Sequence, residues 1–253
     1  MNPSNSLPLW TLFSLALSAC SWPGHVATKA TAFDVPAAGL QRLDCTSHNG
    51  RIDVVGDPDA TQVTVRVEMS VRGHSAEEAA ANLELLQVGR EVDGSTLRLT
   101  GNWPREQLQR CSPSFTFTVT MPAGLELALL GHNGDLRAVD TVGPVRATTH
   151  NGDVTWRGRS RRLELTSHNG DVEADFVGEG EVRGEITTSN GDVQVAFPGA
   201  VDAMFTARTH NGSLTGGSRL AETSVARREL RGRLGSGTGQ LTVVTHNGDV
   251  TVR

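Results

Sequence analysis

The chain has 253 residues and a formal net charge of −5, with 37% hydrophobic, 20% charged and 4% aromatic residues. Its 23 Lys and Arg residues are scattered rather than grouped, which argues against nucleic-acid binding, because that function needs clustered positive charge. The 28 glycines and the scarcity of aromatic residues favour short strands of small residues joined by many tight turns.

The first 32 residues predict export and a lipid anchor. Residues 7–17 are mostly apolar, which suits an export signal but is shorter than the roughly 20 residues of a membrane span. The sequence Leu17-Ser18-Ala19-Cys20 resembles the bacterial lipoprotein box. Residues 1–19 would then be a signal peptide, and Cys20 would be lipidated at the start of a tether over residues 20–32. Residues 1–6 contain no Lys or Arg, so a plain secretory signal is the alternative.

The residue after the proposed lipidation site bears on location. Ser21 follows Cys20, and by analogy with lipoprotein sorting this favours the outer membrane over the inner membrane. We therefore expect an exported outer-membrane lipoprotein that faces the periplasm or the cell surface. Its first partner would be the membrane itself, through the acyl chains.

Residues 33–124 are predicted to form an N-terminal β-rich part with one short helix. Strand-like segments occupy residues 51–55, 61–71, 96–100 and 114–121. Ser75 and Glu78 form a capping box, which predicts a helix near residues 76–87. We expect this part to cover one end of the repeats that follow, because an open end would expose sheet edges and core.

Two cysteines, Cys45 and Cys111, remain after Cys20. An even pair in an exported protein predicts a disulfide. The bond would close a loop of 66 residues and stabilise the fold by about 4 kcal/mol in the chain-entropy model. The alternative is two unpaired buried thiols.

A repeat organises residues 125–253, and one copy precedes them. The unit is an apolar residue, any residue, Ser or Thr, then His-Asn-Gly-Asp and Val or Leu, with Ser replacing His at residue 189. Asn-Gly supports tight turns, so each copy predicts a corner between two strands. The predicted corners are Asn49 and Gly50, Asn133 and Gly134, Asn151 and Gly152, Asn169 and Gly170, Asn190 and Gly191, Asn211 and Gly212, and Asn247 and Gly248.

The spacing of the copies predicts the fold. From His132 onward the intervals are 18, 18, 21, 21 and 36 residues, and the last interval suggests two units, one without the motif. A period near 20 residues with alternating apolar residues is typical of a solenoid of stacked strands. The sequence therefore predicts an all-β fold, a single-stranded β-solenoid (β-helix-like) with an N-terminal β-rich cap. A meander of hairpins is the alternative, although its turns recur every 8–12 residues.

The recurring Ser/Thr-x-Asn-Gly-Asp/Ser-Val/Leu motif behind an export signal resembles a bacterial family of adhesin-like β-strand-repeat domains, related to autotransporter adhesin heads. The resemblance covers about residues 33–253. It implies a β-helix or solenoid with a β-rich N-terminal part, and a role in adhesion that rests on architecture rather than on a known activity.

The histidine row has two interpretations. In the first, each imidazole stacks on the next rung, while Ser, Thr and Asp bind the backbone around the corner. In the second, the stacked imidazoles chelate Zn²⁺, Cu²⁺ or Ni²⁺ in a periplasmic metal-binding protein. The candidate ligands would be His132, His150, His168, His210 and His246.

No enzyme motif stands out, so we expect a non-catalytic envelope protein without a cofactor. A reaction centre needs a unique constellation, whereas the titratable residues here are repeated. A further alternative is a polysaccharide-active β-helix with Asp202, Arg208 and Arg228 in a groove. The expected partners are an envelope protein or a glycan, for which Trp103 and Trp156 are candidate stacking residues, and no nucleic acid.

Overall fold

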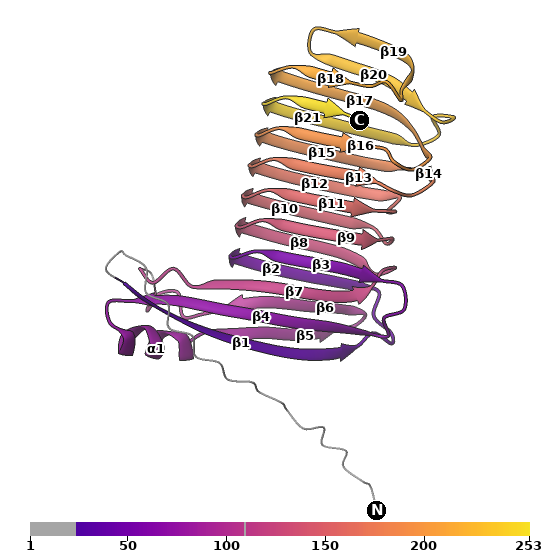
Figure 1. The fold of residues 1–253 in the computed structure, drawn as a ribbon. Helices are drawn as coiled ribbons and strands as arrows, with labels where there is room; N and C mark the ends of the chain where they lie inside the picture. Colours follow the sequence, from indigo (N-terminus) through magenta and orange to yellow (C-terminus); the bar gives the residue numbers. More distant parts are fainter. Residues whose placement is uncertain (1–23, 109) are drawn as a thin grey trace, which may run out of the picture.

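The computed structural model describes residues 24–108 and 110–253. The predicted signal peptide and lipidation site, Cys20, lie outside these residues. The described chain is all-β apart from one helix, and its strands form two large sheets that face each other (Figure 1). Within the described ranges, no helix has the length and apolar character to cross a bilayer.

We call the two sheets A and B. Sheet A contains ten strands, in the spatial order β1 (His25–Pro36), β4 (Gln62–Gly73), β7 (Ser114–Pro122), β3 (Ile52–Asp57), β9 (Leu136–Thr141), β11 (Val154–Gly158), β13 (Val172–Phe176), β16 (Val193–Ala196), β22 (Val250–Val252) and β18 (Leu214–Gly216). Sheet B runs in the spatial order β19 (Ala221–Ala226), β20 (Glu229–Leu234), β17 (Val201–Asn211), β21 (Gln240–Asn247), β15 (Arg183–Asn190), β12 (Arg162–Asn169), β10 (Val145–Asn151), β8 (Glu126–Asn133), β2 (Arg42–Asn49), β6 (Thr96–Asn102) and β5 (Gln87–Asp93). A short strand, β14 (Gly180–Glu181), pairs with the start of β17.

Each repeat forms one rung of a stack. A strand of sheet B runs into an Asn-Gly corner, and the next strand leaves the corner in sheet A. β10 and β11 form such a rung around Asn151 and Gly152. Neighbouring rungs pair in parallel and in register, so Asn151 lies opposite Asn133 on one side and Asn169 on the other. The corners that the sequence predicts are therefore stacked over one another.

The core lies between the two sheets. Alternate residues of the strands face inward, as the apolar pattern predicts, and they are almost fully buried. Four aromatic rings form a row through the upper rungs, with centroids 4.9, 5.4 and 5.7 Å apart from Trp156 through Phe176 and Phe197 to Phe205. Trp156 Nε1 donates a hydrogen bond to Thr141 Oγ1 at 2.9 Å. Trp156 is thus a core residue and is not accessible to a glycan.

The spatial order of the last rungs differs from their order in the chain. The rung β21–β22 lies between β15–β16 and β17–β18, so the chain end is inserted into the stack (Figure 1). The 36-residue interval, which predicts an extra rung without the motif, instead contains the antiparallel hairpin β19–β20. β20 pairs with β17 and covers the outermost rung of sheet B.

The opposite end is closed by a layer of longer strands. β1, β4 and β7 pair in an antiparallel arrangement, and β3 joins this layer to the stack through β7 and β9. Residues 25–32, which the composition predicts as a tether, form the first part of β1 and pair with β4. The corner at Asn49 and Gly50, before residue 125, joins β2 to β3 and belongs to the same stack.

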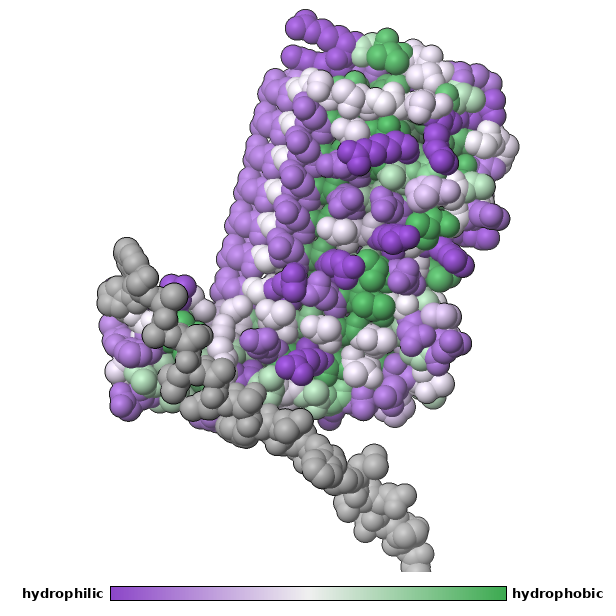
Figure 2. Space-filling model, in the orientation of Figure 1, coloured by the Kyte–Doolittle hydropathy of each residue, from purple (hydrophilic) through white to green (hydrophobic). Residues whose placement is uncertain are grey.

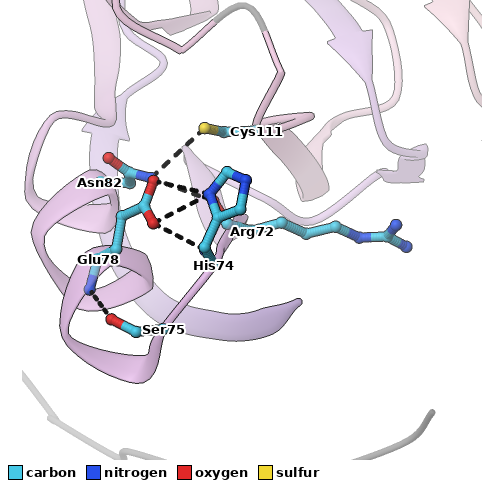
Figure 3. Close-up of polar contacts among 6 residues, drawn as sticks. All are labelled: Arg72, His74, Ser75, Glu78, Asn82 and Cys111. Atoms are coloured by element: carbon cyan, nitrogen blue, oxygen red, sulfur yellow. Dashed lines mark hydrogen bonds and ion pairs between the residues drawn. The ribbon is translucent and has the colours of Figure 1, made fainter. Parts of the chain in front are cut away.

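The predicted helix is present as α1 (Ala76–Glu84), beside β1 and β4. Ser75 is its N-cap, and the Ser75 Oγ accepts a hydrogen bond from the Glu78 backbone N–H at 3.1 Å (Figure 3). The Glu78 carboxylate reaches back and accepts from the His74 backbone N–H at 2.8 Å. Ala79 and Leu83 form the buried face of the helix.

The predicted disulfide between Cys45 and Cys111 is wrong, because both cysteines are free thiols. Cys45 faces the core from β2, opposite Leu99 and Leu129 of the neighbouring strands, and burial raises the pKa of its thiol. Cys111 lies half-buried beside α1, where its Sγ accepts a hydrogen bond from Asn82 Nδ2 at 3.5 Å (Figure 3). An even number of cysteines carries no information about which way the side chains point.

The corner glycines allow the rungs to approach closely. Gly152 has φ +148°, and a Cβ at this position would overlap the carbonyl oxygen of Gly134 in the rung below. The same overlap with the neighbouring rung would occur at Gly134, Gly170, Gly191, Gly212 and Gly248. The backbone N–H groups of Gly134, Gly152, Gly170, Gly191 and Gly248 donate to asparagine carbonyls of the next rung. The Gly152 N–H, for example, bonds to the Asn169 carbonyl at 2.9 Å. Any side chain at this corner would separate two rungs.

This geometry makes a prediction about stability. Gly152→Ala should lower the free energy of unfolding by about 3 kcal/mol, because the new methyl group forces rigid backbone apart and occupies a strained conformation. Gly124→Ala is the matched control, since a Cβ there meets no atom within 4 Å. Urea unfolding followed by far-UV circular dichroism measures both variants. Equal midpoints for the two variants would contradict the close packing of the corners.

Candidate functional site

The corners form one polar edge of the molecule, which Figure 2 shows as parallel columns of side chains at the left. We call this surface the corner edge. Its central column is an asparagine ladder, in which each Nδ2 donates to the Oδ1 of the next asparagine at 2.7–2.8 Å. The ladder brings together all seven predicted corners in the order Asn49, Asn133, Asn151, Asn169, Asn190, Asn247 and Asn211. At its end, Asn49 Nδ2 donates to the Pro113 carbonyl at 2.9 Å.

Two further ladders flank the asparagines. Inside the corner, buried Ser or Thr hydroxyls donate to the glycine carbonyl of the adjacent rung, as Ser167 does to Gly152 at 2.8 Å. Outside it, aspartate carboxylates accept from the backbone N–H one rung above, as Asp153 does from Asp171 at 2.8 Å. The Ser, Thr and Asp residues of the repeat are therefore all bound to the backbone of a neighbouring rung.

The histidines of the repeat form two stacks. His48, His132, His150 and His168 lie in one column, with ring centroids 4.6–5.2 Å apart and planes within 9° of parallel. His246 and His210 form a second pair, 4.6 Å apart and within 5° of parallel. The rung that carries Ser189 separates the two stacks.

This stacking does not support a metal site. The nitrogen lone pairs of an imidazole lie in the ring plane, so in parallel rings they point in the same direction and do not converge on one ion. Among residues 24–108 and 110–253, no group of three or more His, Cys, Asp or Glu side chains could hold a metal ion. His132, His150, His168, His210 and His246 thus stack face to face within their two columns, and their interpretation as metal ligands stays a prediction that this geometry does not favour.

Trp103 lies at the end of the longer stack. Its ring is tilted against His48 at 5.7 Å and stacks on Phe115 at 5.8 Å. The Arg105 guanidinium lies 5.3 Å from its centre. Trp103 remains half-buried, so of the two predicted glycan-stacking residues it is the one with an accessible surface.

A pocket of about 670 Å³ lies where Ser189 interrupts the histidine row. Thr187, Val244 and Arg208 lie side by side on β15, β21 and β17 and form part of its floor. The turn between β19 and β20, residues 226–229, contributes further lining. We call this hollow the arginine pocket. Its remaining lining residues are Thr188, Ser189, Thr209, His210, Thr245 and His246.

The arginine pocket carries net positive charge. Glu229 is its one carboxylate, and it is bound by Arg208 Nε at 2.6 Å and by Arg231 at 2.9 Å. The hydrogen bond from Arg208, followed in size by the one from Arg231, holds the pKa of Glu229 below its usual value. Arg227 and Arg228 are exposed, and no carboxylate of the described residues lies within 4.0 Å of either guanidinium.

Two residues of this pocket are among the candidates predicted from the sequence. Arg208 and Arg228, named in the polysaccharide alternative, both line it. Asp202 does not, since it lies six residues before Arg208 on β17, about 20 Å away along the strand. The Asp202 carboxylate instead accepts hydrogen bonds from Ser236, Gly237 and Thr238. Ser189 and Arg227 were not predicted as pocket residues. Two features of the sequence could have indicated them: the histidine missing from one repeat, and the adjacent arginines within the 36-residue interval.

The end of the histidine stack predicts a pH dependence. Burial lowers the pKa of His48, and the positive charges of His132 and Arg105 lower it further. The unfolded chain, whose histidine pKa is about 6.5, therefore binds this proton more readily than the folded chain. Well above a pH of about 6.5, His48 is neutral in both states and the free energy of unfolding does not depend on its protonation. As the pH falls through about 6.5 toward the lower pKa of the folded state, protonation of the unfolded chain lowers the free energy of unfolding.

Urea unfolding at pH 7.5 and at pH 5.5 measures this effect. We expect a lower midpoint at pH 5.5, and a smaller difference between the two conditions in His48→Gln. His25→Gln is the control, because His25 is exposed and lies outside the histidine row. A His48→Gln variant with the full pH difference of the original chain would show that His48 does not contribute.

Comparisons with known proteins identify the family of the chain. A search of curated proteins finds no match. A solved structure named as a putative cell adhesion protein of Clostridium sporogenes shares 11% identity with a TM-score of 0.47, covering 89% of this chain and 98% of its own. A putative adhesin of Bacteroides fragilis shares 14% identity with a TM-score of 0.38, covering 89% and 97%.

A third solved structure, named as a putative lipid binding protein of Parabacteroides distasonis, shares 10% identity with a TM-score of 0.33, covering 89% of this chain and 96% of its own. These likenesses are too distant to carry an argument about ligands. A family model matches residues 29–253, a range that includes every Asn-Gly corner. The chain therefore belongs to the Toastrack DUF4097 family.

Proposed function

We propose that this chain is a non-catalytic lipoprotein of a bacterial cell envelope, with a structural or adhesin-like binding role. In this proposal the rungs form a single-stranded β-solenoid that is anchored through Cys20 to the outer membrane. The relation to autotransporter adhesin heads belongs to the same proposal. The Toastrack DUF4097 family match supports the architecture, and the lipoprotein-box sequence supports the anchor.

One observation carries the structural part of the proposal. The titratable residues of the repeat make the same contacts on successive rungs: histidines stack on histidines, and aspartates accept hydrogen bonds from the next rung. Side chains used in this way stabilise a stack instead of gathering around one reacting group. Such an edge suits a spacer or a docking surface with a fixed shape.

The placement of the two ends supports a spacer. The β1 layer, which begins at His25, and the β19–β20 hairpin lie at opposite ends of the stack (Figure 1). Seven rungs spaced about 4.8 Å apart extend over about 29 Å. Cys20 precedes His25 by five residues, a reach of at most about 18 Å. A lipid on Cys20 would keep the β1 layer near the membrane and present the hairpin end away from it.

The anchor is tested by labelling cells that express the full chain with radioactive palmitate. We expect the label on the original chain and none on Cys20→Ala, because the thioether needs the Cys20 sulfur. Cys111→Ala is the matched control and should keep the label, since this cysteine is half-buried in the folded part. After cell fractionation, the labelled chain should sediment with outer membranes, and Cys20→Ala should be released into the soluble fraction.

Two results would overturn the anchor. Palmitate on Cys20→Ala would place the modification elsewhere, and an unlabelled original chain that fractionates with soluble proteins would favour a plain secretory signal.

A further inference from the structure

We propose that the arginine pocket binds the anionic group of an acidic saccharide, either the phosphate of a phosphorylated sugar or the carboxylate of a uronic acid. This inference names a ligand class for the binding role in the proposed function. It concerns the C-terminal end of the stack, and its test does not use the anchor.

The pocket exists because one rung departs from the repeat. Ser189 stands where six other rungs carry a histidine, so no imidazole fills the space between His168 and His246. The chain then adds the β19–β20 turn beside the same space, and this turn contributes Ala226, Arg227 and Arg228 to the lining. A volume of about 670 Å³ falls within the range of about 300–1,000 Å³ that is usual for small-molecule sites.

The charges of the pocket select an anion. Arg227 and Arg228 have no carboxylate partner among the described residues, while Glu229 is bound to Arg208 and Arg231. Guanidinium groups present planar pairs of N–H donors that match the oxygens of phosphate and carboxylate. An anion bound at these arginines would therefore gain charge-assisted hydrogen bonds at the open side of the pocket.

The floor of the pocket favours a sugar as the carrier of this anion. The hydroxyls of Thr187 and Ser189 lie beside the aliphatic Val244, so hydrogen-bonding groups and an apolar surface stand next to each other. A sugar ring has the same mixture of hydroxyls and C–H groups. The pocket also lies in the rungs of β15, β21 and β17, about 19–29 Å along the stack from the β2 rung. This distance separates it from the headgroups of a membrane at the β1 end.

Titration calorimetry on the full chain tests the proposal with three probes: glucose 6-phosphate, galacturonate and neutral glucose. We expect one or both anionic sugars to bind, no heat from glucose, and weaker binding when the salt concentration is raised. The probe that binds more tightly distinguishes a phosphate from a carboxylate ligand. The double variant Arg227→Ala with Arg228→Ala should weaken binding by at least about tenfold.

Two further variants make the test specific. Arg159→Ala with Arg161→Ala is the matched control, because these exposed arginines lie in the turn between β11 and β12, outside the pocket. Ser189→His should also weaken binding, since it restores an imidazole to the empty position while leaving both arginines in place. It keeps the test informative if the double arginine variant does not fold.

The proposal is overturned if neither anion binds, if glucose binds as tightly as the anions, or if the control pair loses as much affinity as Arg227 and Arg228. Because the measurement uses purified protein in solution, these results leave the lipid anchor untouched. A failure of palmitate labelling would likewise leave the pocket untouched.

Discussion

The fold depends on the close contact between successive corners. Parallel strands of neighbouring rungs are separated by about 4.8 Å, and at the corner this spacing leaves no room for a Cβ. Gly152 and its equivalents meet this constraint, and the asparagine beside each of them uses its amide to bind the rungs above and below. The two requirements explain why Asn-Gly recurs at the seven corners while the buried positions of the strands hold apolar residues of many sizes.

Stacking also explains the choice of the flanking residues. A column of aspartates would repel itself, but each carboxylate in the column accepts a backbone N–H from the next rung, which offsets part of this repulsion. A column of histidines gains contact between parallel flat rings. The same side chains that look like ligands or catalytic groups in the sequence therefore serve to hold one rung on the next.

Much of this fold could be predicted from the sequence, because the Asn-Gly corners, the alternating strands and the capping box before α1 are local signals. The exchanged order of the last two rungs could not be predicted from the sequence. The corners at Asn211 and Asn247 have equivalent motifs, so each fits either position in the stack. The failed pairing of Cys45 with Cys111 depended on side-chain direction, which spacing does not encode. The arginine pocket combines a missing histidine at Ser189 with a distant hairpin turn, and only the tertiary arrangement brings them together.

The inserted position of β21 and β22 has a consequence for how the chain reaches its final form. Among the described strands, β17 pairs with β20, with two residues of β14 and with β21, so its main connection to the earlier strands of sheet B runs through β21, which follows it in the chain. The rung at Asn211 therefore cannot complete its pairing before β21 is present, or it must be displaced when β21 inserts. In a chain that is exported from its N-terminus, the rungs as far as β16 could assemble in chain order, whereas the rung β17–β18 and the β19–β20 hairpin would complete their pairing only after β21 and β22 had followed.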